Sequence, residues 1–265
     1  MPEQEMASYY RSRLMAQNGF SAIFSLRSGG ISPPPFHSLN LGSGLGDTSA
    51  NVEANLKRLM KAAAMKQPHQ SIQVHGCQIL MCSGFGYYHD TQADILISPS
   101  GGALAVRIAD CLPILLADVQ TGMTAAIHAG WRGTVANVAC KAVAKMVNLG
   151  ANPDHMLAML GPCIGTCCFV IDDKTGRLLA GCASGAANFV TTSSSCRADL
   201  REINTLQLRQ AGILAEHIEA WDSCTCCDES NFYSYRRDGG KTGRHLAMIA
   251  ATTSGGSIAE AAAPS

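Results

Sequence analysis

Five short apolar segments follow one another between residues 71 and 131, and they restrict the fold of this chain more than any other feature. Each segment is interrupted by Gly, Pro or Asp before it reaches the length of an ordinary helix. We therefore expect these segments to be buried β-strands. Their sequences are SIQVHG, DILISP, GALAVRIADC, PILLADV and MTAAIHAGW.

Three longer segments have the apolar spacing of helices. Residues 48–65 follow good capping residues, and their apolar side chains share one face. Residues 134–150 have Thr134 as a candidate N-cap and Gly150 as a candidate C-cap. Residues 199–213 form the third predicted helix.

The rest of the chain completes an alternating pattern. Residues 155–165 and 217–224 are expected to contain strands, and residues 233–250 are expected to form a hairpin with the turn DGGKTG. Residues 28–47 are rich in Gly, Pro and Ser, so we expect an irregular loop there.

Because strands and helices are interspersed, the predicted fold class is α/β. We expect a single layered domain with a mixed β-sheet flanked by helices, covering residues 1–252. Residues 253–265 are rich in Gly, Ser and Ala without an apolar period, so we expect them to form a disordered tail.

Composition excludes several partners. The chain has 20 Lys and Arg residues against 20 Asp and Glu residues, so it offers no electrostatic reason to expect nucleic-acid binding. No apolar run approaches the roughly 20 residues that span a bilayer, so we expect no membrane segment. The N-terminus lacks a secretory signal and the twelve cysteines are best explained as reduced thiols, so we expect a cytoplasmic protein, and a monomer.

Three potential metal ligands each lie where an apolar segment meets a loop. These are His75 after SIQV, Cys111 after AVRIAD and His128 after MTAAI. Two imidazoles and a thiolate are a suitable zinc-binding set that leaves a fourth position open, as in catalytic zinc sites. The spacing alone is not specific, and two histidines beside a buried thiol would have the same pattern.

Cys111 and His128 could instead form a thiolate–imidazolium pair for nucleophilic catalysis. Such a pair needs a third group that orients the histidine. Asp110 is the nearest candidate in sequence. It would face away from Cys111 if the strand continued to that point, so a role as a turn cap or a support for the site is favoured.

Other motifs are less specific. The segments LGPCIGTCC and CTCC lack paired zinc-knuckle spacing, so buried small residues near a turn are the favoured interpretation and a zinc site is the alternative. GSGLG only loosely matches a phosphate-binding loop. Arg132 beside Trp131, and Arg244 in YRRDGGKTGRH, could bind an anion bidentately, although a solvated hairpin would have the same composition.

Taken together, the motifs resemble the YfiH-like family, also called the laccase-domain or multicopper polyphenol oxidase family. The resemblance covers about residues 20 to 250. It rests on HSLNLG, QVHG, ADCLPILL, HAGWRGT, GPCIGTCCF, DLREINTLQL and NFYSYRRDGGKTGRH in this order. It implies one α/β domain related to cysteine hydrolases and cytotoxic necrotising factor toxins, with the metal trio His75, Cys111 and His128.

The resemblance also implies an activity on small molecules. The family has been described both as copper-dependent phenol oxidases and as purine nucleoside phosphorylases that also deaminate adenosine; some bacterial members are linked to peptidoglycan editing. Eight histidines without an H-x-H pair argue against a multi-copper cluster, so we expect zinc, with copper as the alternative. We expect Arg132, Arg244 and Asn40 to bind the nucleoside and phosphate.

Overall fold

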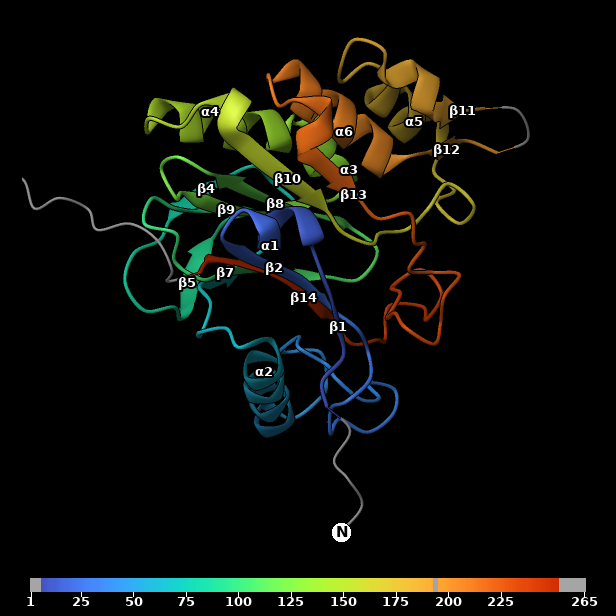
Figure 1. Cartoon of the computed structure of the whole chain (residues 1–265). Helices are drawn as coiled ribbons and strands as arrows, with labels where there is room; N and C mark the ends of the chain where they lie inside the picture. The colour runs from blue at the N-terminus through green and yellow to red at the C-terminus, as the bar shows by residue number, and fades with distance from the viewer. Residues whose placement is uncertain (1–5, 193–194, 253–265) are drawn as a thin grey trace, which may run out of the picture.

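The computed structural model describes residues 6–192 and 195–252. Its centre consists of two β-sheets that pack against each other, with helices on the outer side of each (Figure 1). The larger sheet has six strands in the order β13-β10-β8-β9-β6-β4 and is mixed, because the outer pairs β10–β13 and β4–β6 are parallel. Its strands are β4 Ile79–Met81, β6 Ile95–Ser98, β8 Leu112–Asp118, β9 Thr124–Ala129, β10 Met156–Leu160 and β13 Ile218–Ala220.

The second sheet has four antiparallel strands in the order β1-β2-β14-β7. They are β1 Tyr9–Arg11, β2 Phe20–Ser25, β7 Leu104–Ile108 and β14 His245–Ala251. Two small two-stranded sheets lie outside this core. They are formed by β3 Gln70–Ile72 with β5 Tyr88–Gln92, and by β11 Val190–Thr191 with β12 Arg197–Ala198.

Helices cover both outer faces. Figure 1 shows α4 and α6 over the six-stranded sheet and α2 beneath the four-stranded sheet. None of the helices in the described part of the chain has the length and hydropathy needed to cross a bilayer. The helices are α1 Arg13–Gln17, α2 Ser49–Ala63, α3 Trp131–Val135, α4 Val138–Asn148, α5 Asp173–Ala180 and α6 Leu200–Gln210, with short 3-10 turns at Pro153–His155, Ala186–Phe189 and Ala215–His217.

Strand β8 explains why the sequence has continuous apolar runs. Leu112, Ile114 and Leu116 pack under the helices, whereas Leu115 and Ala117 pack between the two sheets. Alternate side chains of a strand point to opposite faces, so a strand covered on both sides must be apolar throughout. The expected layered α/β fold with a mixed sheet is therefore confirmed, and its strands divide between two main sheets.

The predicted helix over residues 134–150 is wrong in its first turn. The chain forms two helices, α3 and α4, separated at Asn137, whose φ of 57° lies in the left-handed region. Thr134 is not an N-cap. It is buried inside α3, where its Oγ1 accepts a hydrogen bond of 2.9 Å from Asn204 Nδ2 on α6.

The predicted hairpin over residues 233–250 is also wrong. Only β14 is a strand, and it pairs with β2 and β7 instead of with the preceding segment. Side chains close that segment: Asp238 Oδ2 accepts from Thr242 Oγ1 at 2.7 Å, and the Tyr233 N–H donates to His245 Nε2 at 2.8 Å. The expected loop over residues 28–47 contains no helix or strand. The tail at 253–265 lies outside the described residues, so the boundary at residue 252 stays a prediction.

Candidate metal centre and its cavity

The structure brings His75, Cys111 and His128 together at the end of the six-stranded sheet where β8 begins and β9 finishes. Cys111 directly precedes β8, and His128 lies in the neighbouring strand β9. His75 lies in the loop after β3, and its own φ of 60° is in the left-handed region. One ligand atom of each residue lies within 4.8 Å of the others. The His75 and His128 rings are 4.8 Å apart between centroids and steeply inclined at 72°. These donors can hold a transition-metal ion.

Asp94 orients this group, and the sequence did not identify it. Its side chain is fully buried just before β6, and its Oδ1 lies 2.7 Å from His128 Nδ1. The same carboxylate accepts the backbone N–H groups of His75 at 2.9 Å and Gly76 at 2.8 Å. Asp94 therefore fixes the His128 ring through Nδ1, which leaves Nε2 available as a ligand, and also fixes the loop that carries His75.

Close contacts perturb the titration of Cys111 and His128. Burial alone would raise the pKa of the Cys111 thiol, but the neighbouring His128 and His75 outweigh it and lower that pKa to about 6. Burial opposes protonation of His128, but Cys111 and Asp94 raise the pKa of His128 to about 9. Without a metal ion the site therefore favours a thiolate–imidazolium pair, and the thiolate is also the form that binds metal.

Asp110 supports the surrounding loops, and its carboxylate is not hydrogen-bonded to His128. Its backbone has a left-handed φ of 83°, and its side chain is buried. Its carboxylate accepts from Thr225 Oγ1 at 2.6 Å, Ser234 Oγ at 3.1 Å and the Arg236 N–H at 2.7 Å. Asp110 thus has the supporting role that the sequence favoured, and it joins the C-terminal segment to the start of β8.

The trio opens into a cavity of about 580 Å³, a size typical of small-molecule sites. Four arginines line it, and none of them forms an ion pair within the described ranges 6–192 and 195–252. Apolar and aromatic residues form much of the remaining wall. The arginines are Arg107, Arg132, Arg236 and Arg244, and the apolar and aromatic residues are Leu45, Ile164, Phe169 and Tyr235.

The two predicted arginines both reach the cavity. The Arg132 guanidinium stacks over the Trp131 ring at 4.3 Å and is exposed. Arg244 is half-buried, and its Nη1 donates to the carbonyl oxygens of Thr242 at 2.9 Å and Gly243 at 3.0 Å. Burial lowers the pKa of Arg244 from its ordinary value. Arg107 and Arg236 were not predicted to line it: Arg107 lies within an apolar strand segment, and Arg236 lies in YRRDGGKTGRH, where Arg244 was chosen instead.

Asn40 lies outside the cavity lining. It is fully buried, and its Nδ2 donates to the Gly42 carbonyl oxygen and to Asp47. Its Oδ1 accepts the N–H groups of Gly42 and Arg244, both at 3.0 Å. The expected direct contact with substrate is therefore replaced by an indirect role: Asn40 positions Arg244 and the GSGLG loop, whose Gly42, Ser43 and Leu45 line the cavity.

Among the described residues, two other groups could hold a metal ion. His69, Cys82 and His89 form one, but His69 Nδ1 and His89 Nε2 are already hydrogen-bonded to each other at 2.8 Å.

The other group contains Cys167, Cys168, Cys224 and Cys227. The interpretation of these four as buried small residues is wrong, because Cys167 and Cys227 are exposed and the other two are half-buried. The overlooked signal was the C-x-x-C spacing of Cys224 and Cys227.

The fold and cavity place the chain among layered α/β proteins with a two-histidine, one-cysteine group at a sheet edge. Residues 21–252 match the family described as multi-copper polyphenol oxidoreductase laccase. Because this match covers most of the chain, the chain belongs to that family.

Named relatives and solved structures agree with this assignment. The chain is 37% identical over 234 residues to "Purine nucleoside phosphorylase YfiH" of Escherichia coli, covering 87% of this chain and 93% of the relative. It is 36% identical over 245 residues to a "Purine nucleoside phosphorylase" of Deinococcus radiodurans, covering 91% and 92%. The crystal structure of YlmD from Geobacillus stearothermophilus superposes with a TM-score of 0.85 at 31% identity, covering 94% of this chain and 98% of that one.

Proposed function

We propose that this chain is a metal-dependent purine nucleoside phosphorylase. It would cleave adenosine and inosine with phosphate to give the free base and ribose 1-phosphate, and methylthioadenosine to give adenine and 5-methylthioribose 1-phosphate. It would also deaminate adenosine. The names of the relatives support the phosphorylase activity. The structural observation that carries the proposal is that the candidate metal trio and four arginines line one cavity. These arginines form no ion pair with any residue that the structure describes.

The chemistry of the donors fits a zinc ion held by His75, Cys111 and His128. A bound zinc ion with an open coordination position supplies a Lewis acid and activates water, as deamination requires. The protein's own contribution is to hold the ligands ready: Asp94 keeps His128 in one orientation, and the paired charges keep Cys111 as a thiolate. Copper is the alternative metal, because the same donors bind it.

The arginines provide the second requirement of phosphorolysis, an anion pocket. A guanidinium group binds phosphate bidentately, and Arg132 and Arg244 present two such groups to the cavity. Phe169 and Tyr235 add aromatic surface suited to the planar purine. Phosphate and the purine base would therefore each meet a complementary surface in the same cavity.

Product analysis tests this proposal. With inosine, hypoxanthine and ribose 1-phosphate should form only when phosphate is present. With adenosine and no phosphate, inosine should still form. Removal of metal with a chelator should abolish both reactions, and added zinc should restore them. Absence of base release from all three nucleosides at saturating phosphate would reject the phosphorylase assignment.

A metal-free hydrolase is the second candidate, because the perturbed Cys111–His128 pair resembles a cysteine nucleophile with its base. Its substrate would be a peptidoglycan precursor. In that case chelators would have no effect, thiol alkylation would inactivate the protein, and a dipeptide-linked cell-wall precursor would be cleaved.

Polyphenol oxidation is the activity in the family's description. Reduction of O₂ by four electrons requires several redox centres acting together. Within the described residues, the cavity contains one two-histidine, one-cysteine group. The observations therefore favour nucleoside chemistry over a multi-copper reaction.

A further inference from the structure

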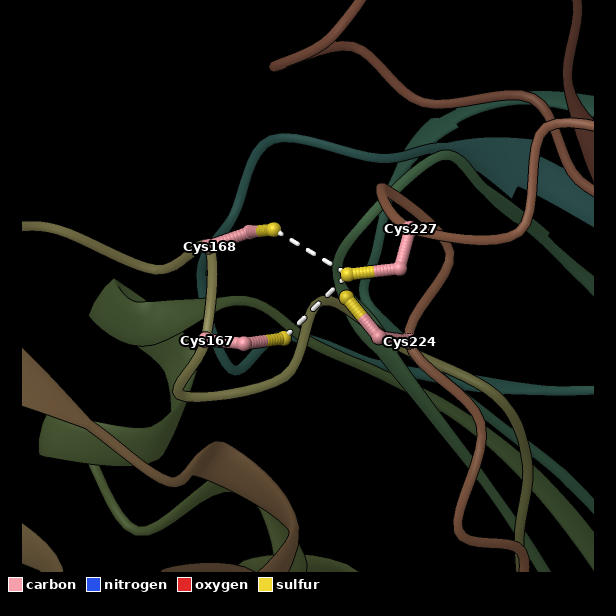
Figure 2. A group of neighbouring side chains, drawn as sticks. All are labelled: Cys167, Cys168, Cys224 and Cys227. Atoms are coloured by element: carbon pink, nitrogen blue, oxygen red, sulfur yellow. Dashed lines mark hydrogen bonds between the residues drawn. The ribbon is translucent and has the colours of Figure 1, made fainter.

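Four cysteines outside the cavity lining form a compact group of soft ligands. Cys167 and Cys168 lie on the loop after β10, and Cys224 and Cys227 lie on the loop after β13. Their Sγ atoms all lie within 4.8 Å of one another. Figure 2 shows the side chains of the two loops pointing toward each other.

The sheet brings these loops together. Strands β10 and β13 are parallel neighbours, so the loops that follow them leave the same edge of the sheet. An isolated parallel bridge between Cys163 and Cys224 extends this pairing into the loops. The Gly165 N–H also donates to Cys224 Sγ at 3.2 Å. The backbone therefore fixes where the thiols lie.

The sulfur separations suit one tetrahedral ion. Four sulfurs at the usual zinc–sulfur distance of about 2.3 Å would lie about 3.8 Å from one another. Cys227 Sγ lies 3.4 Å from both Cys167 Sγ and Cys168 Sγ, so only a small expansion is needed. These contacts are far longer than a disulfide bond of about 2.05 Å. An iron–sulfur cluster would need more space, because its inorganic core lies between the thiolates.

Three guanidinium groups lie against the two cysteine loops, and one of them, that of Arg237, is also ion-paired with Asp238. Four thiolates around a divalent ion leave a net charge of about −2, which nearby cations stabilise. These guanidinium groups donate hydrogen bonds to backbone carbonyl oxygens of the loops. On the first loop, Arg197 donates to Thr166 at 2.9 Å and to Cys167, and Arg236 donates to Cys168 at 3.1 Å and to Val170 at 3.0 Å. On the second loop, Arg237 donates to Thr225 at 3.0 Å and to Cys226 at 3.3 Å.

We propose that Cys167, Cys168, Cys224 and Cys227 bind one zinc ion as a closed structural site. Four cysteine ligands in tetrahedral reach are the donor set of structural zinc sites and leave no position for substrate. The two loops also supply Ile164, Phe169 and Arg236 to the cavity wall. The ion would thus fasten together two segments that shape the cavity, and this role does not depend on which reaction the cavity performs.

Cobalt substitution tests the site separately from the cavity. The background variant is C111A, because it removes the thiolate of the candidate metal trio, which could otherwise contribute its own thiolate–cobalt absorption. Metal-free, reduced C111A protein should develop the intense thiolate-to-cobalt absorption of a tetrathiolate site when Co²⁺ is added. Zinc should bleach this absorption, and metal analysis after zinc loading should find zinc retained through gel filtration. C111A/C227S should lose at least ten-fold in cobalt affinity together with the tetrathiolate spectrum.

C226S in the same background is the matched control, because Cys226 lies on the same loop but outside the group. It should bind cobalt as C111A does. If C227S fails to fold, C167S on the opposite loop, also exposed, provides the same measurement. The proposal is overturned if C111A gives no thiolate–cobalt absorption, if the absorption survives C227S or C167S, or if C226S removes it equally. A disulfide between Cys167 and Cys227 in protein isolated with its native thiol state trapped would also overturn it.

Discussion

The Oδ1 atom of Asp94 lies 2.7 Å from Nδ1 of His128, and both side chains are almost completely buried. The same carboxylate holds the backbone of the loop that carries His75. Burial opposes ionisation of Asp94, but hydrogen bonds from His128 and from backbone N–H groups outweigh it and keep the pKa of Asp94 below its usual range. One charged group therefore sets the position of two of the three candidate metal ligands.

Replacing Asp94 should lower the affinity of the centre for metal, although Asp94 is not itself a candidate ligand. In D94N, the amide can accept from His128, but its NH₂ group opposes the backbone N–H donors of the His75 loop. Loss of such an orienting partner typically lowers metal affinity or activity 10–100-fold. Zinc affinity and nucleoside turnover should be measured beside D90N, whose Asp90 is exposed on β5. Equal affinities in the two variants would show that Asp94 does not organise the centre.

Gly130 should be intolerant of any side chain. A Cβ atom at this position would lie 3.0 Å from Cys111 Sγ and 3.1 Å from His75 Cδ2. G130A should therefore displace both candidate ligands and lower zinc affinity and turnover by at least ten-fold, while the melting temperature changes little. G181A is the control, because its Cβ would come no closer than 3.4 Å to any atom. Wild-type turnover by G130A would contradict the proposed geometry.

The sequence predicted the metal trio because each of its members ends an apolar segment. It could not predict Asp94, which lies 19 residues after His75 and 34 before His128. Only the pairing of β6 with β9 places that carboxylate under the imidazole.

The layered α/β fold followed from the alternation of apolar runs and helical patterns. The break at Asn137 did not, because the helical periodicity continues across it and tertiary packing of Thr134 against Asn204 decides the local conformation. The false hairpin has a similar origin: the turn-like segment before β14 satisfies its polar groups through Asp110 and Asp238 and not through a second strand.

Arg244 provides a test of the phosphate pocket. Lysine retains the charge but lacks the bidentate fork, so R244K should raise the phosphate KM about ten-fold or more. Deamination of adenosine uses no phosphate and should be spared. R209K, on the exposed end of α6, is the matched control. Equal losses in both reactions, or no loss in either, would count against binding of phosphate by Arg244.

His245 should make the protein sensitive to acid. The side chain is fully buried among Phe24, Phe232 and Tyr233, and burial lowers the pKa of His245 from its ordinary value of 6.5 to about 3. Between these values the unfolded chain binds a proton at this residue that the native chain does not, so stability falls as pH falls below 6.5. At pH 5 this single residue should lower the free energy of unfolding by about 2 kcal/mol relative to neutral pH.

The variant H245Q separates this effect from the titration of other buried groups. Glutamine cannot take up a proton but can still accept the Tyr233 N–H that His245 Nε2 now accepts at 2.8 Å. H245Q should be less stable than the wild type at pH 7, because its side chain fills the aromatic site less well. Between pH 6.5 and 4.5, urea unfolding should show a smaller loss of stability for H245Q than for the wild type, whereas H37Q, at an exposed position, should follow the wild type. The same slope in H245Q and the wild type would mean that His245 is not the group that titrates.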